Sequence, residues 1–155
     1  MQHNGGSGVS RRVHGGGRAY GQCARRRKQP LLRYFAGTRT APDEFDVVYT
    51  GDLGAVGSQL FNEILQREGV VLKKHEDCGL IVYSQEDQDV KSGGSGAGCS
   101  ASVLCCHVLP RVKEGKIKRA LFMSTGALMS QQTFLQGESI PCIAHLFELS
   151  GGDSQ

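Results

Sequence analysis

Residues 93–100 read GGSGAGCS, a run of small residues with four glycines directly before a predicted helix. Such a loop can present backbone amides to an anion, or it can let two parts of the chain pack closely together. It lacks the lysine of a GxxxxGK[ST] phosphate loop and meets GxGxxG only approximately, without a strand directly before it. Both interpretations stay open, and Gly96 and Gly98 are the candidates for contact with a ligand.

Polar residues after two expected strands form a second set of candidates. Ser130, Gln136 and Ser139 lie in an irregular segment after a strand, where α/β folds often place ligands, and their side chains can donate to a carboxylate. A structural role in a capped turn fits Ser130 equally well. Asp52, in TGDLG, is expected to cap the next helix, with a ligand role through water or a cation as the alternative.

The histidine and cysteine residues give little sign of metal or nucleophilic chemistry. His145 alternates with apolar neighbours in CIAHL, which favours a core histidine over a ligand-binding one. Cys105, Cys106 and His107 have no second pair at ligand spacing, so no metal site and no cofactor are predicted. Cys99 follows the glycine loop, but no histidine is placed by sequence to activate its thiol.

The elements that must position these residues alternate along the chain. Apolar runs predict strands at 45–50, 79–84, 119–125 and 142–149, and helical periodicity predicts helices at 55–68 and 99–114. Pro110 predicts a break of the second helix near Val108. Strands and helices in alternation indicate an α/β layered domain over residues 31–149, with a short helix at its start and a frayed tail at 150–155.

Charge is distributed unevenly along the 155 residues. Residues 1–39 hold nine basic residues and no acid, so the formal net charge of +3 divides into +9 there and −6 in the remainder. We expect residues 1–30 to be disordered, because they contain almost no aliphatic side chains. An arginine-rich nucleic-acid tail is an alternative function, although nothing downstream resembles a nucleic-acid module.

Several longer segments carry a family resemblance. In order, FDVVYTGDLGAVGSQLFNEILQREG, DCGLIVYS, GGSGAGCSASVL, GKIKRALFMSTGALMS and QGESIPCIAHLFEL resemble the C-terminal half of the stage V sporulation protein AD family. That family looks like the thiolase and β-ketoacyl synthase fold, a layered mixed sheet with helices. The resemblance over residues 31–149 therefore implies one thiolase-like half-domain.

The resemblance also implies a function. Condensing enzymes of this fold use a cysteine, a histidine and an asparagine, and neither the histidine nor the asparagine stands at the matching places, which here hold Thr50, Asp52 and residues 96–98. It thus implies a non-catalytic protein that binds dipicolinic acid (pyridine-2,6-dicarboxylate) and helps its uptake into the developing spore. An acyl-transferring enzyme is the alternative. Other subunits of a membrane-associated complex would be partners, with the protein in the forespore cytoplasm, peripheral to the inner spore membrane.

The basic head departs from the family pattern. Read one base out of phase, RAYGQCARRR allows an alanine-rich segment like the one that precedes this point in the family. We therefore expect residues 1 to about 29 to be a frameshifted translation, with the N-terminal half of the family's fold missing from this chain.

Overall fold

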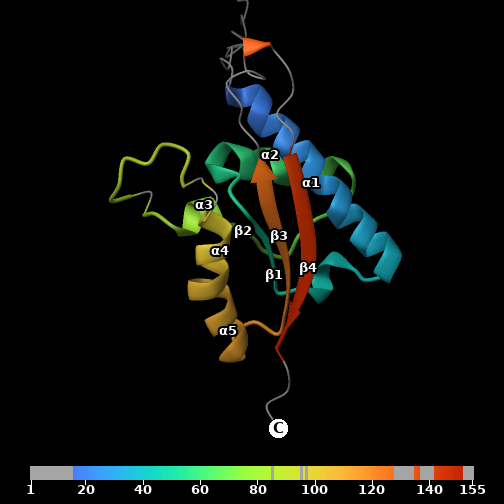
Figure 1. Ribbon diagram of the computed structural model, residues 1–155. Helices are drawn as coiled ribbons and strands as arrows, with labels where there is room; N and C mark the ends of the chain where they lie inside the picture. The colour runs from blue at the N-terminus through green and yellow to red at the C-terminus, as the bar shows by residue number, and fades with distance from the viewer. Residues whose placement is uncertain are drawn as a thin grey trace, which may run out of the picture.

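The computed structural model describes residues 16–84, 86–94, 96, 98–127, 135–136 and 142–151. The helices and strands within them are, in order, α1 (Gly16–Thr38), η1 (Pro42–Glu44), β1 (Val47–Thr50), α2 (Gly54–Arg67), β2 (His75–Asp77), α3 (Cys78–Ile81), α4 (Cys99–Val103), η2 (Leu104–Val108), α5 (Leu109–Lys113), β3 (Arg119–Ala127) and β4 (Cys142–Ser150). Figure 1 shows their arrangement.

The four strands form one mixed sheet in the order β2-β1-β3-β4. Strand β1 pairs in parallel with both β2 and β3, whereas β4 runs antiparallel to β3. Because parallel strands end at the same edge, the residues that follow β1, β2 and β3 lie along one edge of the sheet. The candidate ligand-binding residues that follow β1 and β3 are therefore expected at this edge.

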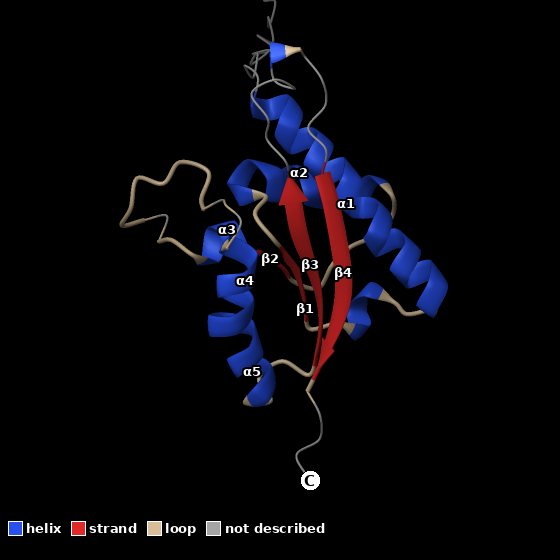
Figure 2. Ribbon diagram, viewed as in Figure 1, coloured by secondary structure: helices blue, strands red, loops and turns tan. Residues whose placement is uncertain are grey.

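Helices cover both faces of the sheet, as Figure 2 shows. Alternate residues of β1 divide between two cores, since successive side chains of a strand point to opposite faces. Val48 packs with side chains of α1 and α2, including Leu31 and Phe61. Val47 and Tyr49 pack with the helical segment that α4, η2 and α5 form. The α/β layered class expected from the sequence is therefore confirmed.

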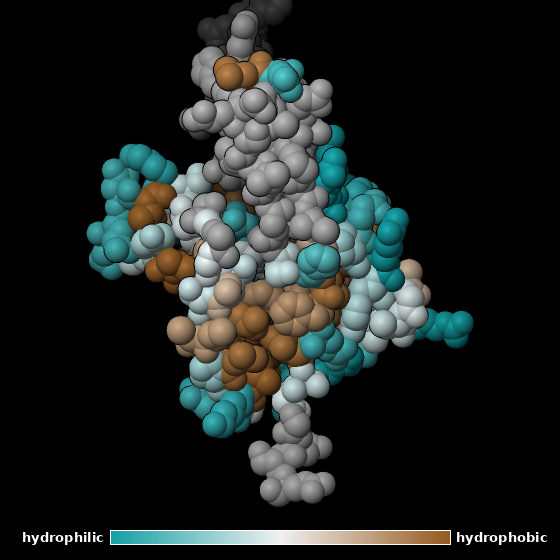
Figure 3. Space-filling model, in the orientation of Figure 1, coloured by the Kyte–Doolittle hydropathy of each residue, from teal (hydrophilic) through white to brown (hydrophobic). Residues whose placement is uncertain are grey.

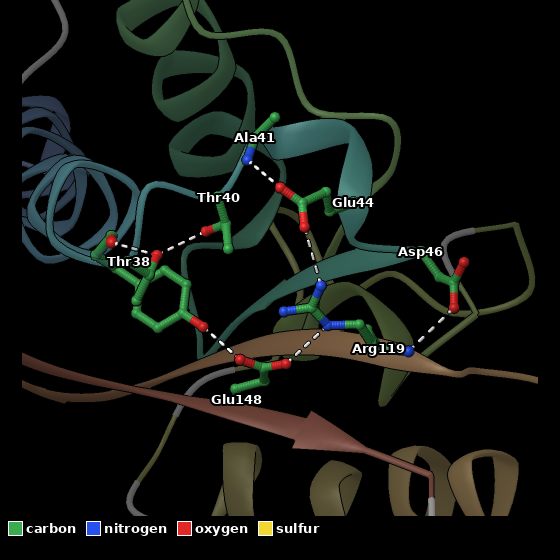
Figure 4. A network of polar contacts seen from close by, with 8 residues as sticks. Thr38, Thr40, Ala41, Glu44, Asp46, Arg119 and Glu148 are labelled. Atoms are coloured by element: carbon green, nitrogen blue, oxygen red, sulfur yellow. Dashed lines mark hydrogen bonds and ion pairs between the residues drawn. The ribbon is translucent and has the colours of Figure 1, made fainter. Parts of the chain in front are cut away.

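The opposite edge of the sheet is held by a polar network (Figure 4). Arg119 donates to Glu148 at 2.8 Å and to Glu44 at 3.1 Å, and Glu148 also accepts from Tyr34 of α1. Asp46 accepts from the backbone amide of Lys118 at 2.8 Å. These contacts join α1, η1, β3 and β4 at the edge of the sheet that lies opposite the carboxyl ends of the parallel strands.

Two expectations about the elements are wrong. Residues 16–30 are helical rather than disordered, since α1 begins at Gly16 and its Ala24 and Leu31 are completely buried. Residues 1–15, which the same expectation covers, lie outside the described residues. The expected strand at 79–84 is instead the helix α3, preceded by the strand β2. Asp77 decides this change, since its side chain caps α3 by accepting from the amide of Gly79.

The predicted break near Val108 takes a milder form. The helical segment continues from α4 to α5 through η2, one wider π-helical stretch at Leu104–Val108. Pro110 lies in the first turn of α5, where its missing amide hydrogen costs little. The predicted strands at 45–50, 119–125 and 142–149 and the helix at 55–68 agree with β1, β3, β4 and α2, within a few residues at their ends.

One face of the domain exposes apolar side chains. Figure 3 shows an apolar area on the side where Figure 1 places α4, α5 and β4. Phe147 of β4 is 37% exposed and Leu109 of α5 is 42% exposed.

In the described part of the chain, no helix combines the length and apolar character that crossing a bilayer requires.

Candidate functional site

The carboxyl edge of the sheet brings together segments that are far apart in the sequence. The turn after β1 lies beside the start of α4, with the Cys99 Sγ 3.9 Å from the carbonyl oxygen of Gly51. The amide of Ala55 donates to the carbonyl oxygen of Ser92, 2.7 Å away. The two neighbourhoods singled out in the sequence, TGDLG and the glycine loop, therefore form one site.

The side chain of Asp77 holds the turn after β1 through hydrogen bonds. Its side chain is 2% exposed and accepts four hydrogen bonds. Their donors are the Thr50 hydroxyl at 2.6 Å and the amides of Leu53, Gly54 and Gly79 at 2.9, 2.8 and 3.0 Å. Burial raises the pKa of Asp77, and the hydrogen bonds from Thr50 and from the turn oppose that rise. The turn's amides are thus already occupied by a carboxyl group of the protein itself.

His75 is the imidazole in this network. Its Nε2 lies 2.9 Å from the Thr50 hydroxyl, which itself donates to Asp77. The hydroxyl hydrogen is therefore in use, so Nε2 must donate to Thr50. Burial, with the nearby Arg27 charge, lowers the pKa of His75 to about 4. A neutral histidine fixed in one tautomer serves structure here rather than proton transfer.

Arg27 approaches the same turn from α1. Its side chain is 4% exposed, and its Nη2 donates to the Asp52 Oδ1 at 3.1 Å. Burial lowers the pKa of Arg27, and the carboxyl groups of Asp52 and Asp77 oppose that change. Among the described residues the buried Nη1 has no hydrogen-bond partner. Leaving such a donor unpaired costs about 1–3 kcal/mol, so it calls for an explanation.

The glycine loop divides into a crowded half and an open half. The Gly94 amide donates to the Gly79 carbonyl oxygen at 2.6 Å. A Cβ on Gly93 would lie 2.6 Å from that same oxygen, and one on Gly79 would clash with the Gly94 carbonyl. Close packing therefore explains these glycines.

Gly96 and Gly98 differ from them, since an added Cβ would meet nothing within 4 Å at Gly96 and only the Ser102 hydroxyl, at 4.0 Å, at Gly98. Gly96 has a φ of +134°, a conformation that favours glycine. Both glycines are exposed, so close packing does not explain these two positions of the loop.

Cys99 lies at the start of a helix, where a reactive thiol could stand, but its surroundings raise the pKa of the thiol rather than lower it. Burial raises the pKa of its thiol, and the charges of Asp52 and Asp77 raise it further. Its sulfur lies 3.9 Å from the Gly51 carbonyl oxygen, and the charges that act on the thiol are those of Asp52 and Asp77. A thiol held protonated in this way is a poor nucleophile at neutral pH.

The other predicted site residues have different outcomes. Asp52 does not cap α2, because the side chain of Asp77 accepts the amides that begin that helix, and Asp52 pairs with Arg27 instead. His145 is exposed on β4, so the expectation of a core histidine is wrong. Gln136 is exposed in a short helical turn. Ser130 and Ser139 lie outside the described residues.

Register places His145 near the site without bringing it into contact. Thr50 pairs with Met123, and Met123 pairs with Leu146. His145 therefore lies two strand spacings, or about 10 Å, from the end of β1, at the same edge of the sheet.

A cavity of about 220 Å³ lies away from this edge, between the end of α2 and the start of β2. It is lined by Leu65, Val71 and seven further residues.

Sequence reasoning missed Arg27 and Asp77. Asp77 carries a local signal, since an aspartate two residues before a glycine is a usual capping arrangement. Arg27 carries no such local signal, because it stands in a run of four basic residues.

Among the described residues, no group of three His, Cys, Asp or Glu side chains could hold a metal ion.

The fold and this site define a mixed α/β domain that collects a buried carboxyl group, a buried guanidinium and a glycine loop at one strand edge. Residues 22–150 match the model of the Stage V sporulation protein AD family, and the chain belongs to that family. It is 43% identical over 127 residues to stage V sporulation protein AD of Bacillus subtilis (strain 168). That alignment covers 80% of this chain and 37% of the relative, so the chain spans well under half of the relative's length.

Family membership implies a role in sporulation. The family match begins at residue 22, before the segments whose resemblance is visible by inspection. The match thus includes residues 22–30, and the reading-frame hypothesis for residues 1 to about 29 stays a prediction.

Proposed function

We propose that this chain is a non-catalytic, thiolase-like half-domain that binds dipicolinic acid and takes part in its uptake into the developing spore. Its partners would be other subunits of a membrane-associated complex. The protein would act in the forespore cytoplasm, peripheral to the inner spore membrane. Membership in a sporulation family supports the process, and the chemistry of the site supports the binding role.

The observation that carries the proposal is the state of Cys99. Catalysis of acyl transfer by a thiol needs a base or a positive charge that lowers its pKa, and fixed donors for an oxyanion. Here burial raises the pKa of the Cys99 thiol, the charges of Asp52 and Asp77 raise it further, and Asp77 already holds the amides of Leu53 and Gly54. Gly96 and Gly98 are exposed, so a small planar anion can reach the loop at these positions.

Titration calorimetry of the 155-residue chain tests the proposal. We expect heat on addition of dipicolinate and none with acetyl-coenzyme A or an oligonucleotide. Heat with acetyl-coenzyme A, together with a thioester on Cys99 by mass spectrometry, would favour the acyl-transferring alternative. An oligonucleotide signal that weakens steeply with salt would favour a basic nucleic-acid tail.

A further inference from the structure

We propose that the outward side of α1 binds the headgroups of an anionic phospholipid bilayer through Arg25, Arg26 and Arg33. These three residues, the outward arginines, are exposed, whereas Leu31 and Phe35 on the opposite side of the helix are buried. Arg33 follows the other two by eight and seven residues, a spacing that brings all three to one side of a helix. This surface is separate from the candidate ligand site, so the inference goes beyond the proposed function.

The outward arginines have no acidic partner among the described residues. In that part of the chain, the ion pairs of α1 are those of Arg27 with Asp52 and of Lys28 with Glu68. Residues 1–39 contain no acid, so no carboxylate of the same segment offsets the charge. Figure 3 shows hydrophilic residues along the side where Figure 1 places α1. An exposed cationic surface of this kind attracts a polyanion, and salt screens the attraction.

A lipid surface fits this side of the helix better than a nucleic acid does. Proteins that bind single strands stack the bases on aromatic side chains. Among residues 24–38 of α1, the exposed residues besides the outward arginines are Gln29, Ala36, Gly37 and Thr38, none of them aromatic. A bilayer needs no stacking, because its surface potential attracts each basic side chain, with a gain of about fivefold in affinity.

The contact with lipid is expected to stay at the headgroups. Leu31 and Phe35 pack in the core with Phe61 of α2, so this part of α1 has no apolar side left to insert between lipid chains. On the buried side of the helix, Arg27 pairs with Asp52 in the turn after β1. A helix is about 10 Å across, so a bilayer bound here would lie about one helix diameter from that turn.

Sedimentation with vesicles tests the assignment, using the 155-residue chain and a variant that combines Arg25→Gln, Arg26→Gln and Arg33→Gln. We expect the unchanged chain to sediment with vesicles of phosphatidylglycerol and phosphatidylcholine in equal amounts, but not with phosphatidylcholine alone. High salt should release it. The arginine variant should bind about 100-fold more weakly, from about fivefold for each charge. Replacing the same residues by lysine should keep the binding, because the surface potential acts on charge.

A matched control removes the same number of charges elsewhere. It combines Lys73→Gln, Lys91→Gln and Lys116→Gln, at exposed positions outside α1, and should bind the vesicles nearly as the unchanged chain does. An equal loss in both variants, or full binding by the arginine variant, would refute the assignment. Release from the vesicles by an oligonucleotide at equal phosphate concentration would refute it too, and would make this side of α1 a nucleic-acid surface. Dipicolinate calorimetry is independent of these results, so this inference and the proposed function can each fail alone.

Discussion

Replacing Asp77 measures how strongly the candidate site depends on one buried carboxyl group. In Asp77→Asn the amide oxygen can keep one pair of hydrogen bonds, from Gly54 and Gly79 to Oδ1. The amide nitrogen then faces the Leu53 amide, another donor, at the position of Oδ2, whereas Thr50 can reverse its hydroxyl and accept. One buried backbone amide is left unpaired, at a cost of about 1–3 kcal/mol.

Asp77→Ala removes all four acceptor contacts and should cost at least about 4 kcal/mol, close to the whole stability of a small domain. Urea unfolding followed by circular dichroism measures both variants, and Asp89→Asn is the control because Asp89 and its partner Lys91 are 83% and 81% exposed. We expect that control within about 0.5 kcal/mol of the unchanged chain. An Asp77→Asn variant as stable as the control would show that the carboxyl group does not hold the turn.

Three further predictions follow from the packing and the pKa values. His75 binds its proton more weakly in the folded protein, where its pKa is about 4, than in the unfolded chain. The contribution of His75 to the free energy of unfolding is therefore complete above about pH 6.5, and it falls by up to about 3 kcal/mol as the pH drops to about 4. Urea unfolding at several pH values measures this fall, and His75→Gln should make it smaller. Gly79→Ala should cost about 1–3 kcal/mol because its Cβ meets the Gly94 carbonyl, whereas Gly98→Ala should be nearly neutral; equal thermal unfolding midpoints would contradict this difference. Phe147→Ser should lower the fluorescence of bound anilinonaphthalene sulfonate, since it removes an apolar side chain from the exposed face; unchanged dye binding would place the exposed area elsewhere.

The elements that the sequence predicted well are those whose periodicity is unambiguous. The helical spacing of Leu60, Phe61, Ile64 and Leu65 anticipates α2, and Phe61 and Leu65 are indeed fully buried. The apolar run GLIVYS fails, because a short run of this kind fits a strand or a buried helix equally well. The capping contact of Asp77 settles the choice in favour of α3.

The sequence predicted a short helix from residue 31 on but missed the part of α1 before it, for a reason that also hid Arg27. Among residues 24–38 of α1, the buried ones are Ala24, Arg27, Leu31 and Phe35, which follow a helical spacing. An arginine at one of these positions counts as polar in any hydrophobic pattern, so the period is lost. Its burial is offset by Asp52, 25 residues away, and a pairing at that separation leaves no sign in a single sequence.

Most of the backbone amides described at the carboxyl edge are used by the protein itself. The amides of Leu53, Gly54 and Gly79 are held by Asp77, and the amide of Gly94 is held by the Gly79 carbonyl. These contacts make the turn rigid and remove its amides from use by an anion. The Nη1 of Arg27 is buried and has no hydrogen-bond partner among the described residues. Arg27 therefore serves this edge through its ion pair with Asp52, which holds α1 against the turn that follows β1.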